Sequence, residues 1–98
     1  MAKISKAQQE LKDFDLVFKA LAHSTRRLIL TLLLAENGKL NAGDIVGHFD
    51  FKWPTITRHL KQLEEAGLIE SAKDGTQNIY TLNSNRMKTV LNNWLKWF

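Results

Sequence analysis

The clearest pattern of apolar and polar positions lies between Trp53 and Gly67. At about 100° per residue, three branched apolar side chains fall on one side of a helix, namely Ile56, Leu60 and Leu63. The opposite side carries a proline ring and two cations, which belong to Pro54, Arg58 and Lys61. Thr55 and Thr57 flank this outer side. The segment is therefore predicted to form one short helix with a packing face and an outer face of hydroxyls and cations.

The outer face of this helix suits either water or a polyanion. A charged face on a single amphipathic helix is most often simply solvated. Phosphates attract Lys and Arg, however, and base edges are contacted by polar side chains near a helix N-terminus. The neighbouring elements decide between these two interpretations.

Apolar spacing predicts two helices ahead of this segment. Residues 5–22 carry a stripe at spacings of three and four, together with the residue before them: Ile4, Ala7, Leu11, Phe14, Phe18 and Leu21. Ser24 is expected to cap a second helix over residues 25–36. Four of its side chains are predicted to face inward, namely Leu28, Ile29, Leu32 and Leu33. Arg26 and Arg27 contact either acidic groups of the same fold or a phosphate, and the structural role is favoured.

A helix-turn-helix and a wing follow from the next segments. Leu40 is expected to form a short extended link, after which Asn41 caps a short helix over residues 42–49. A tight connection then leads into the amphipathic helix, which completes a helix-turn-helix. Two predicted strands, residues 68–72 and 78–82, flank an Asp-Gly turn and form a β-hairpin.

The final helix, residues 83–98, has a broad apolar surface that would be costly to leave in water. Its side chains either close the core or pair with the N-terminal helix across a dimer two-fold axis, and the dimer is favoured. The predicted dimer interface comprises Ile4, Ala7, Leu11, Phe14, Phe18, Met87, Val90, Leu91, Trp94, Trp97 and Phe98.

Composition is consistent with one globular domain over residues 1–98 that has an anionic partner. The net charge of +4 favours nucleic acid or an anionic membrane surface. The chain contains no cysteine, which excludes disulfides and thiolate metal sites. The N-terminus lacks the apolar core of a signal peptide, and the longest apolar run, residues 28–35, is too short to span a bilayer. A cytoplasmic protein that does not enter membranes is expected.

The predicted fold is mainly α with a small β-hairpin wing: a winged helix-turn-helix with N- and C-terminal dimerisation helices. At this point the sequence resembles the ArsR/SmtB-type bacterial repressors over about residues 16–98. Three motifs carry the resemblance, at residues 18–30 (FKALAHSTRRLIL), 42–49 (AGDIVGHF) and 54–68 (PTITRHLKQLEEAGL). The AGDI stretch and the WLKWF ending look most like the metal-independent branch that includes the sporulation-delay autorepressors.

The resemblance implies a homodimer whose two recognition helices enter successive major grooves of double-stranded DNA at an inverted repeat. It also implies that the bound dimer blocks transcription, often of its own operon. The chain departs from the family where a serine commonly stands two residues ahead of the recognition-helix proline. Lys52 occupies that position and Trp53 follows it, so a cap is lost and a cation and an indole are gained.

Metal binding and catalysis are not expected. Known metal ligands in such repressors are Cys, or His with Asp and Glu on the last helix, and residues 83–98 contain none of these. His23, His48 and His59 lie in different predicted elements, and His48 is expected at the surface. The glycines are scattered, and no nucleophile lies beside a base. We therefore expect no metal, no other cofactor and no enzyme activity.

The predicted function is a dimeric, sequence-specific transcriptional repressor without a metal effector. The predicted DNA contacts are Thr55, Thr57, Arg58 and Lys61, then Lys52, Trp53 and His59, with Lys73, Thr76 and Gln77 in the wing. For Trp53, packing against Phe51 or the wing is an equal alternative. Two other functions stay open: a winged-helix protein-interaction module to which DNA binding is incidental, and a sensor of an unidentified small molecule.

Overall fold

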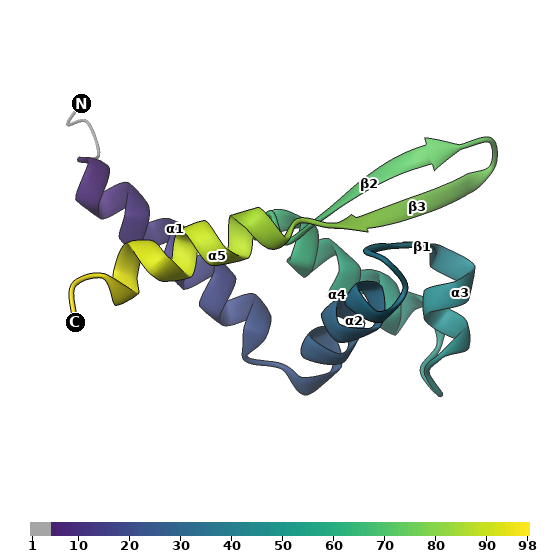
Figure 1. Cartoon of the computed structure of the whole chain (residues 1–98). Coiled ribbons are helices and arrows are strands. Elements are labelled where there is room, and N and C mark those ends of the chain that lie inside the picture. Colours follow the sequence, from purple (N-terminus) through teal and green to yellow (C-terminus); the bar gives the residue numbers. More distant parts are fainter. Residues whose placement is uncertain (1–4) are drawn as a thin grey trace, which may run out of the picture.

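A computed structural model describes residues 5–98, and the predicted winged helix-turn-helix is confirmed (Figure 1). The helices are α1 (Lys6–Leu21), α2 (Ser24–Ala35), α3 (Ala42–Gly47), α4 (Trp53–Glu65) and α5 (Ser84–Leu95). The strands are β1 (Lys39–Asn41), β2 (Ile69–Asp74) and β3 (Gln77–Leu82). Helices α1 and α5 lie side by side at one end of the molecule, and the β2–β3 hairpin extends at the other. Ile4, predicted in the dimer interface, lies outside the described residues.

Helix ends follow capping chemistry, with one correction. Asn41 caps α3 as predicted, because its side-chain oxygen accepts the Asp44 N–H at 2.7 Å. The prediction that Ser24 caps α2 is wrong, since Ser24 is already helical. His23 is the N-cap, and its Nδ1 accepts the Thr25 N–H at 3.2 Å. Gly67 follows the end of α4 with a φ of +74°, a conformation that glycine adopts without steric cost.

The wing belongs to a three-stranded antiparallel sheet in the order β1–β3–β2. The extended link predicted at Leu40 is a strand, because Leu40 pairs with Tyr80 on β3. The hairpin turn is shorter than predicted and consists of Gly75 and Thr76, with a φ of +64° at the glycine. Beyond Ile69, every residue of β2 is exposed, so the outer part of the hairpin stands clear of the body.

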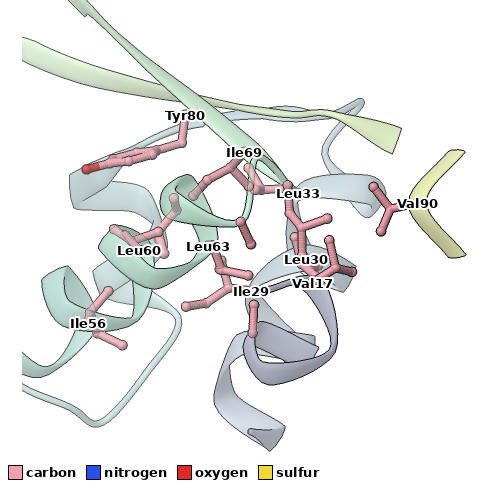
Figure 2. Close-up of a cluster of buried hydrophobic side chains, with 14 residues drawn as sticks. Val17, Ile29, Leu30, Leu33, Ile56, Leu60, Leu63, Ile69, Tyr80 and Val90 are labelled. Carbon is pink, nitrogen blue, oxygen red and sulfur yellow. The ribbon is translucent and has the colours of Figure 1, made fainter. Parts of the chain in front are cut away.

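The core gathers side chains from all five helices and the base of the hairpin (Figure 2). The predicted inner face of α4 is confirmed, since Ile56, Leu60 and Leu63 are buried. The prediction that Leu28 faces inward is wrong, because its side chain is 57% exposed. Ile29, Leu30 and Leu33 form the buried stripe of α2, and Leu28 lies about 100° away from Ile29 on the helix. Leu32, also predicted inward, is only half-buried.

Candidate nucleic-acid interface

The outer face of α4 presents its polar side chains to solvent. Thr57, Arg58 and Lys61 are exposed, and Thr55 is half-buried. Lys52 is the N-cap residue and makes no side-chain capping bond, so the predicted loss of a cap is confirmed. Trp53 is 53% exposed at the first helical position. These residues share one surface, because positions three and four apart on a helix are neighbours.

The first acidic side chain along α4 lies in its last turn and points toward the wing. Glu64 accepts a hydrogen bond from the Ser71 hydroxyl of β2, with 2.9 Å between the oxygens. This bond joins the last turn of α4 to the base of the hairpin. The N-terminal two thirds of the outer face therefore carry cations and hydroxyls without an intervening carboxylate.

The predicted wing contacts form a second, separate group. Lys73 and Gln77 lie on β2 and β3 on either side of the turn, and Thr76 is in the turn itself. All three are exposed. The hairpin holds them at its far end, away from the helices α1 and α5 (Figure 1).

His59 differs from its neighbours because it faces α2. Its Nδ1 lies 3.2 Å from Nη1 of Arg26, and its ring lies 4.5 Å from that of His23, centroid to centroid. The side chain is half-buried. The structure thus separates His59 from the exposed surface of Arg58 and Lys61 and places it at the contact between the recognition helix and the α1–α2 junction. His48 is exposed, as predicted.

Arg26 shows a role that the sequence left open. Its Nε donates to the Ala20 carbonyl at 2.7 Å, and its Nη2 donates to the Lys19 carbonyl at 3.0 Å. The guanidinium therefore satisfies carbonyls at the C-terminal end of α1, where a cation also complements the helix dipole. Its partners within the described residues are backbone groups and His59 rather than carboxylates. Arg27 makes a similar bond to the Leu21 carbonyl at 2.7 Å.

The α1–α5 pair leaves a large apolar face uncovered. Phe14 packs against Phe18 and Trp94, with ring centroids 5.4 and 4.6 Å away. A groove of about 670 Å³ runs between the two helices, lined mainly by apolar side chains. Leu11, Phe18, Trp97 and Phe98 are exposed, as is Ala7, whereas Met87 and Leu91 are half-buried. Val90 corrects the predicted interface, because it is 3% exposed and packs in the core of the single chain.

Comparison with known proteins identifies the family to which this geometry belongs. Residues 23–71, from the cap of α2 into β2, match the family described as "Bacterial regulatory protein, arsR family". The chain belongs to the arsR family. This family and the two repressors described below are regulators rather than enzymes.

Several ArsR-family relatives cover most of the chain. The transcriptional repressor SdpR of Bacillus subtilis is 41% identical, over 83% of each chain, which confirms the predicted resemblance to a sporulation-delay repressor. An arsenical resistance operon repressor of Staphylococcus aureus is 35% identical, over 84% of this chain and 77% of its own. A homodimeric winged helix-turn-helix DNA-binding domain from Mycobacterium bovis, solved by NMR, has a TM-score of 0.71 and 27% identity, over 97% of this chain and 88% of its own.

Two further findings concern the partners of this ArsR-family chain. Within residues 5–98, the structure brings together no cluster of three or more His, Cys, Asp or Glu side chains suited to a metal ion. None of the described helices has the length and apolar character needed to cross a membrane.

The His23–Arg26–His59 cluster predicts a pH dependence of stability in this ArsR-family chain. Burial, followed by the nearby His23, Arg26 and Arg58, holds the pKa of His59 below its ordinary value of 6.5. At pH values between this ordinary pKa, which applies to the unfolded chain, and the lowered pKa of the folded chain, the unfolded chain binds the proton more readily. The free energy of unfolding is therefore expected to be at its plateau above pH 6.5 and to fall as the pH drops through the lowered pKa.

This dependence is measured by urea unfolding at a series of pH values from about 7.5 to 5. His59→Gln, which cannot be protonated in this range, should flatten the profile. The control is His48→Gln, which removes an exposed imidazole at the C-cap of α3, outside this cluster, and should retain the slope of the parent chain. Equal slopes for the parent chain and His59→Gln would contradict the assignment.

Proposed function

We propose that the protein is a cytoplasmic, homodimeric transcriptional repressor that binds an inverted repeat in a promoter, its own included, without a metal effector. The observation that carries this proposal is that α4 exposes Thr57, Arg58 and Lys61 on one face, while its opposite face is buried in the core. The repressor names of SdpR and the arsenical resistance relatives, and the homodimeric state of the Mycobacterium bovis domain, support it.

The arrangement suggests how DNA is contacted. The first turns of α4 enter the major groove, as in other helix-turn-helix proteins, and place Arg58 and Lys61 against phosphates or guanine edges. The threonines contact phosphate or a thymine methyl, and the wing residues Lys73, Thr76 and Gln77 contact the adjacent backbone or minor groove. Pairing of two chains through α1 and α5 then presents two α4 helices to half-sites about one turn, ~34 Å, apart.

The proposal that no metal effector is needed is supported by the scarcity of metal-ligating side chains. The chain has no cysteine, and α5 contains no His, Asp or Glu. His23 and His59 are engaged with the Thr25 amide and Arg26. Isothermal titration with Zn²⁺, before and after operator binding, tests this part of the proposal. A metal-dependent change in operator affinity would contradict it.

Arg58→Ala and Lys61→Ala are each expected to weaken operator binding and, where a phosphate contact is lost, to lower the salt slope by about one unit. The measurement is a titration of operator DNA at several salt concentrations. Lys12→Ala removes an exposed cation from α1 and should leave the slope unchanged. If neither α4 variant differs from Lys12→Ala in affinity or slope, the DNA-contacting face is wrongly assigned.

The exposed aromatic end of α5 also fits a protein-interaction module to which DNA binding is incidental. Titration against the protein's own promoter and against unrelated DNA separates the two functions. A specific repressor should prefer its promoter by about 10³ or more. Equal affinities would favour the interaction module.

A further inference from the structure

Exposed apolar side chains flank Lys52 at the N-terminal tip of α4, ahead of the cations on the outer face. Trp53 is 53% exposed and Pro54 is exposed beside it. Phe51, also exposed, stacks on Phe49 with ring centroids 6.3 Å apart. Within residues 5–98 no aromatic ring, that of Phe51 included, stacks on the Trp53 indole.

The backbone of the same tip offers few free hydrogen-bond donors. Pro54 has no N–H, and the N–H groups of Thr55 and Ile56 both donate to the Lys52 carbonyl, at 3.1 and 3.2 Å. No side chain caps the helix. Polar contact with base edges therefore falls to side chains, and the two-ring face of the Trp53 indole is suited to an apolar contact.

Helical spacing sets Trp53 in line with the predicted DNA contacts. Trp53, Thr57 and Lys61 are four residues apart, so they form one ridge along the outer face of α4. A helix that brings Thr57 and Lys61 to DNA also brings the Trp53 indole there, at the N-terminal end that approaches base edges most closely. An indole cannot neutralise a phosphate. The apolar group that base pairs present in the major groove is the C5-methyl of thymine.

We propose that Trp53 is a specificity-determining residue that packs its indole on the methyl group of a thymine in each half-site of the operator. This inference rests on the proposed function and adds to it that each half-site contains a thymine at the position of Trp53. Burial of one methyl-sized group stabilises a contact by about 0.8 kcal/mol, which corresponds to about a fourfold change in affinity per half-site. Two half-sites give about 15-fold.

The test begins with an operator selected from random-sequence DNA by the full chain. Each thymine of the operator is then replaced singly by uracil, which keeps the O4 acceptor and base pairing and lacks only the methyl group. One thymine per half-site should lose about fourfold in affinity for the parent chain. The same replacement should have no effect on Trp53→Gln, whose thermal unfolding should match that of the parent because the indole is exposed.

Thr57→Ser is the matched control, because it removes a methyl group from the next position on the same ridge and should retain the uracil penalty at the thymine assigned to Trp53. If the parent chain binds every uracil-containing operator as tightly as the original, the inference is overturned. It is also overturned if Trp53→Gln still loses affinity on uracil replacement, or if only Thr57→Ser abolishes that loss. These results would leave the proposed function standing. Selection that enriches no sequence would instead contradict the proposed function.

Discussion

Replacing Arg26 by methionine is expected to lower the free energy of unfolding by about 3 kcal/mol, because it removes hydrogen bonds from a charged donor and leaves the Ala20 carbonyl without its buried partner. Arg26 is 8% exposed, and its guanidinium bonds the carbonyls of Ala20 and Lys19 as well as His59. Methionine keeps a long, flexible, apolar side chain, so the loss reports mainly on the polar head. Chemical denaturation monitored by circular dichroism measures it.

Arg27→Met is the matched control. Arg27 is the next residue on α2 and also donates to a carbonyl of α1, that of Leu21, but its side chain is exposed. Water replaces that bond when the guanidinium is removed, and the expected loss is about 1 kcal/mol or less. Arg26→Lys should recover only part of the stability, since a single ammonium cannot reproduce the planar fork. Equal losses of unfolding free energy for Arg26→Met and Arg27→Met would show that burial of the guanidinium does not add to its stabilising effect.

The elements with strong periodicity could be predicted from the sequence. The two faces of α4 were correctly predicted because Ile56, Leu60 and Leu63 recur at helical spacing, and beyond the first turn the outer face carries only polar side chains. In α2 apolar side chains surround most of the helix, so periodicity does not decide which stripe turns inward. In α5 they form one broad face, and periodicity does not decide which part of that face enters the core. Leu28 is exposed and Val90 is buried because packing against other elements makes that choice.

Contacts between segments that are distant in the sequence could not be predicted from local patterns. The strand at Lys39–Asn41 has three residues, and it exists because Leu40 pairs with Tyr80 far along the chain. The bonds from Arg26 to the end of α1 likewise depend on how two helices meet. A signal was present in the sequence: an arginine in the first turn after a helix break lies close to the last carbonyls of the preceding helix. His23 was missed as a cap because histidine is outside the usual capping residues.

Leu95→Lys is expected to prevent homodimerisation and to lower operator affinity by about 100-fold or more, because two linked half-site contacts become one. Leu95 is 53% exposed in the single chain and lines the groove between α1 and α5. A lysine there leaves the fold of one chain intact. In a dimer formed through this face the same ammonium would be buried among Phe14, Phe18 and Trp94 without a partner, which is strongly unfavourable.

Asn92→Lys is the control, since it adds the same charge at an exposed position of α5 outside that groove. Sedimentation of the two variants and the parent gives the oligomeric state, and titration of the operator then gives affinity. A Leu95→Lys variant that remained dimeric would mean that this face is not the interface. A monomeric variant with undiminished affinity would mean that one recognition helix suffices for binding. That result would contradict the inverted repeat but not the DNA-binding surface on α4. Only the joint loss of dimer and affinity, with Asn92→Lys unaffected, connects the apolar α1–α5 face to DNA binding by α4.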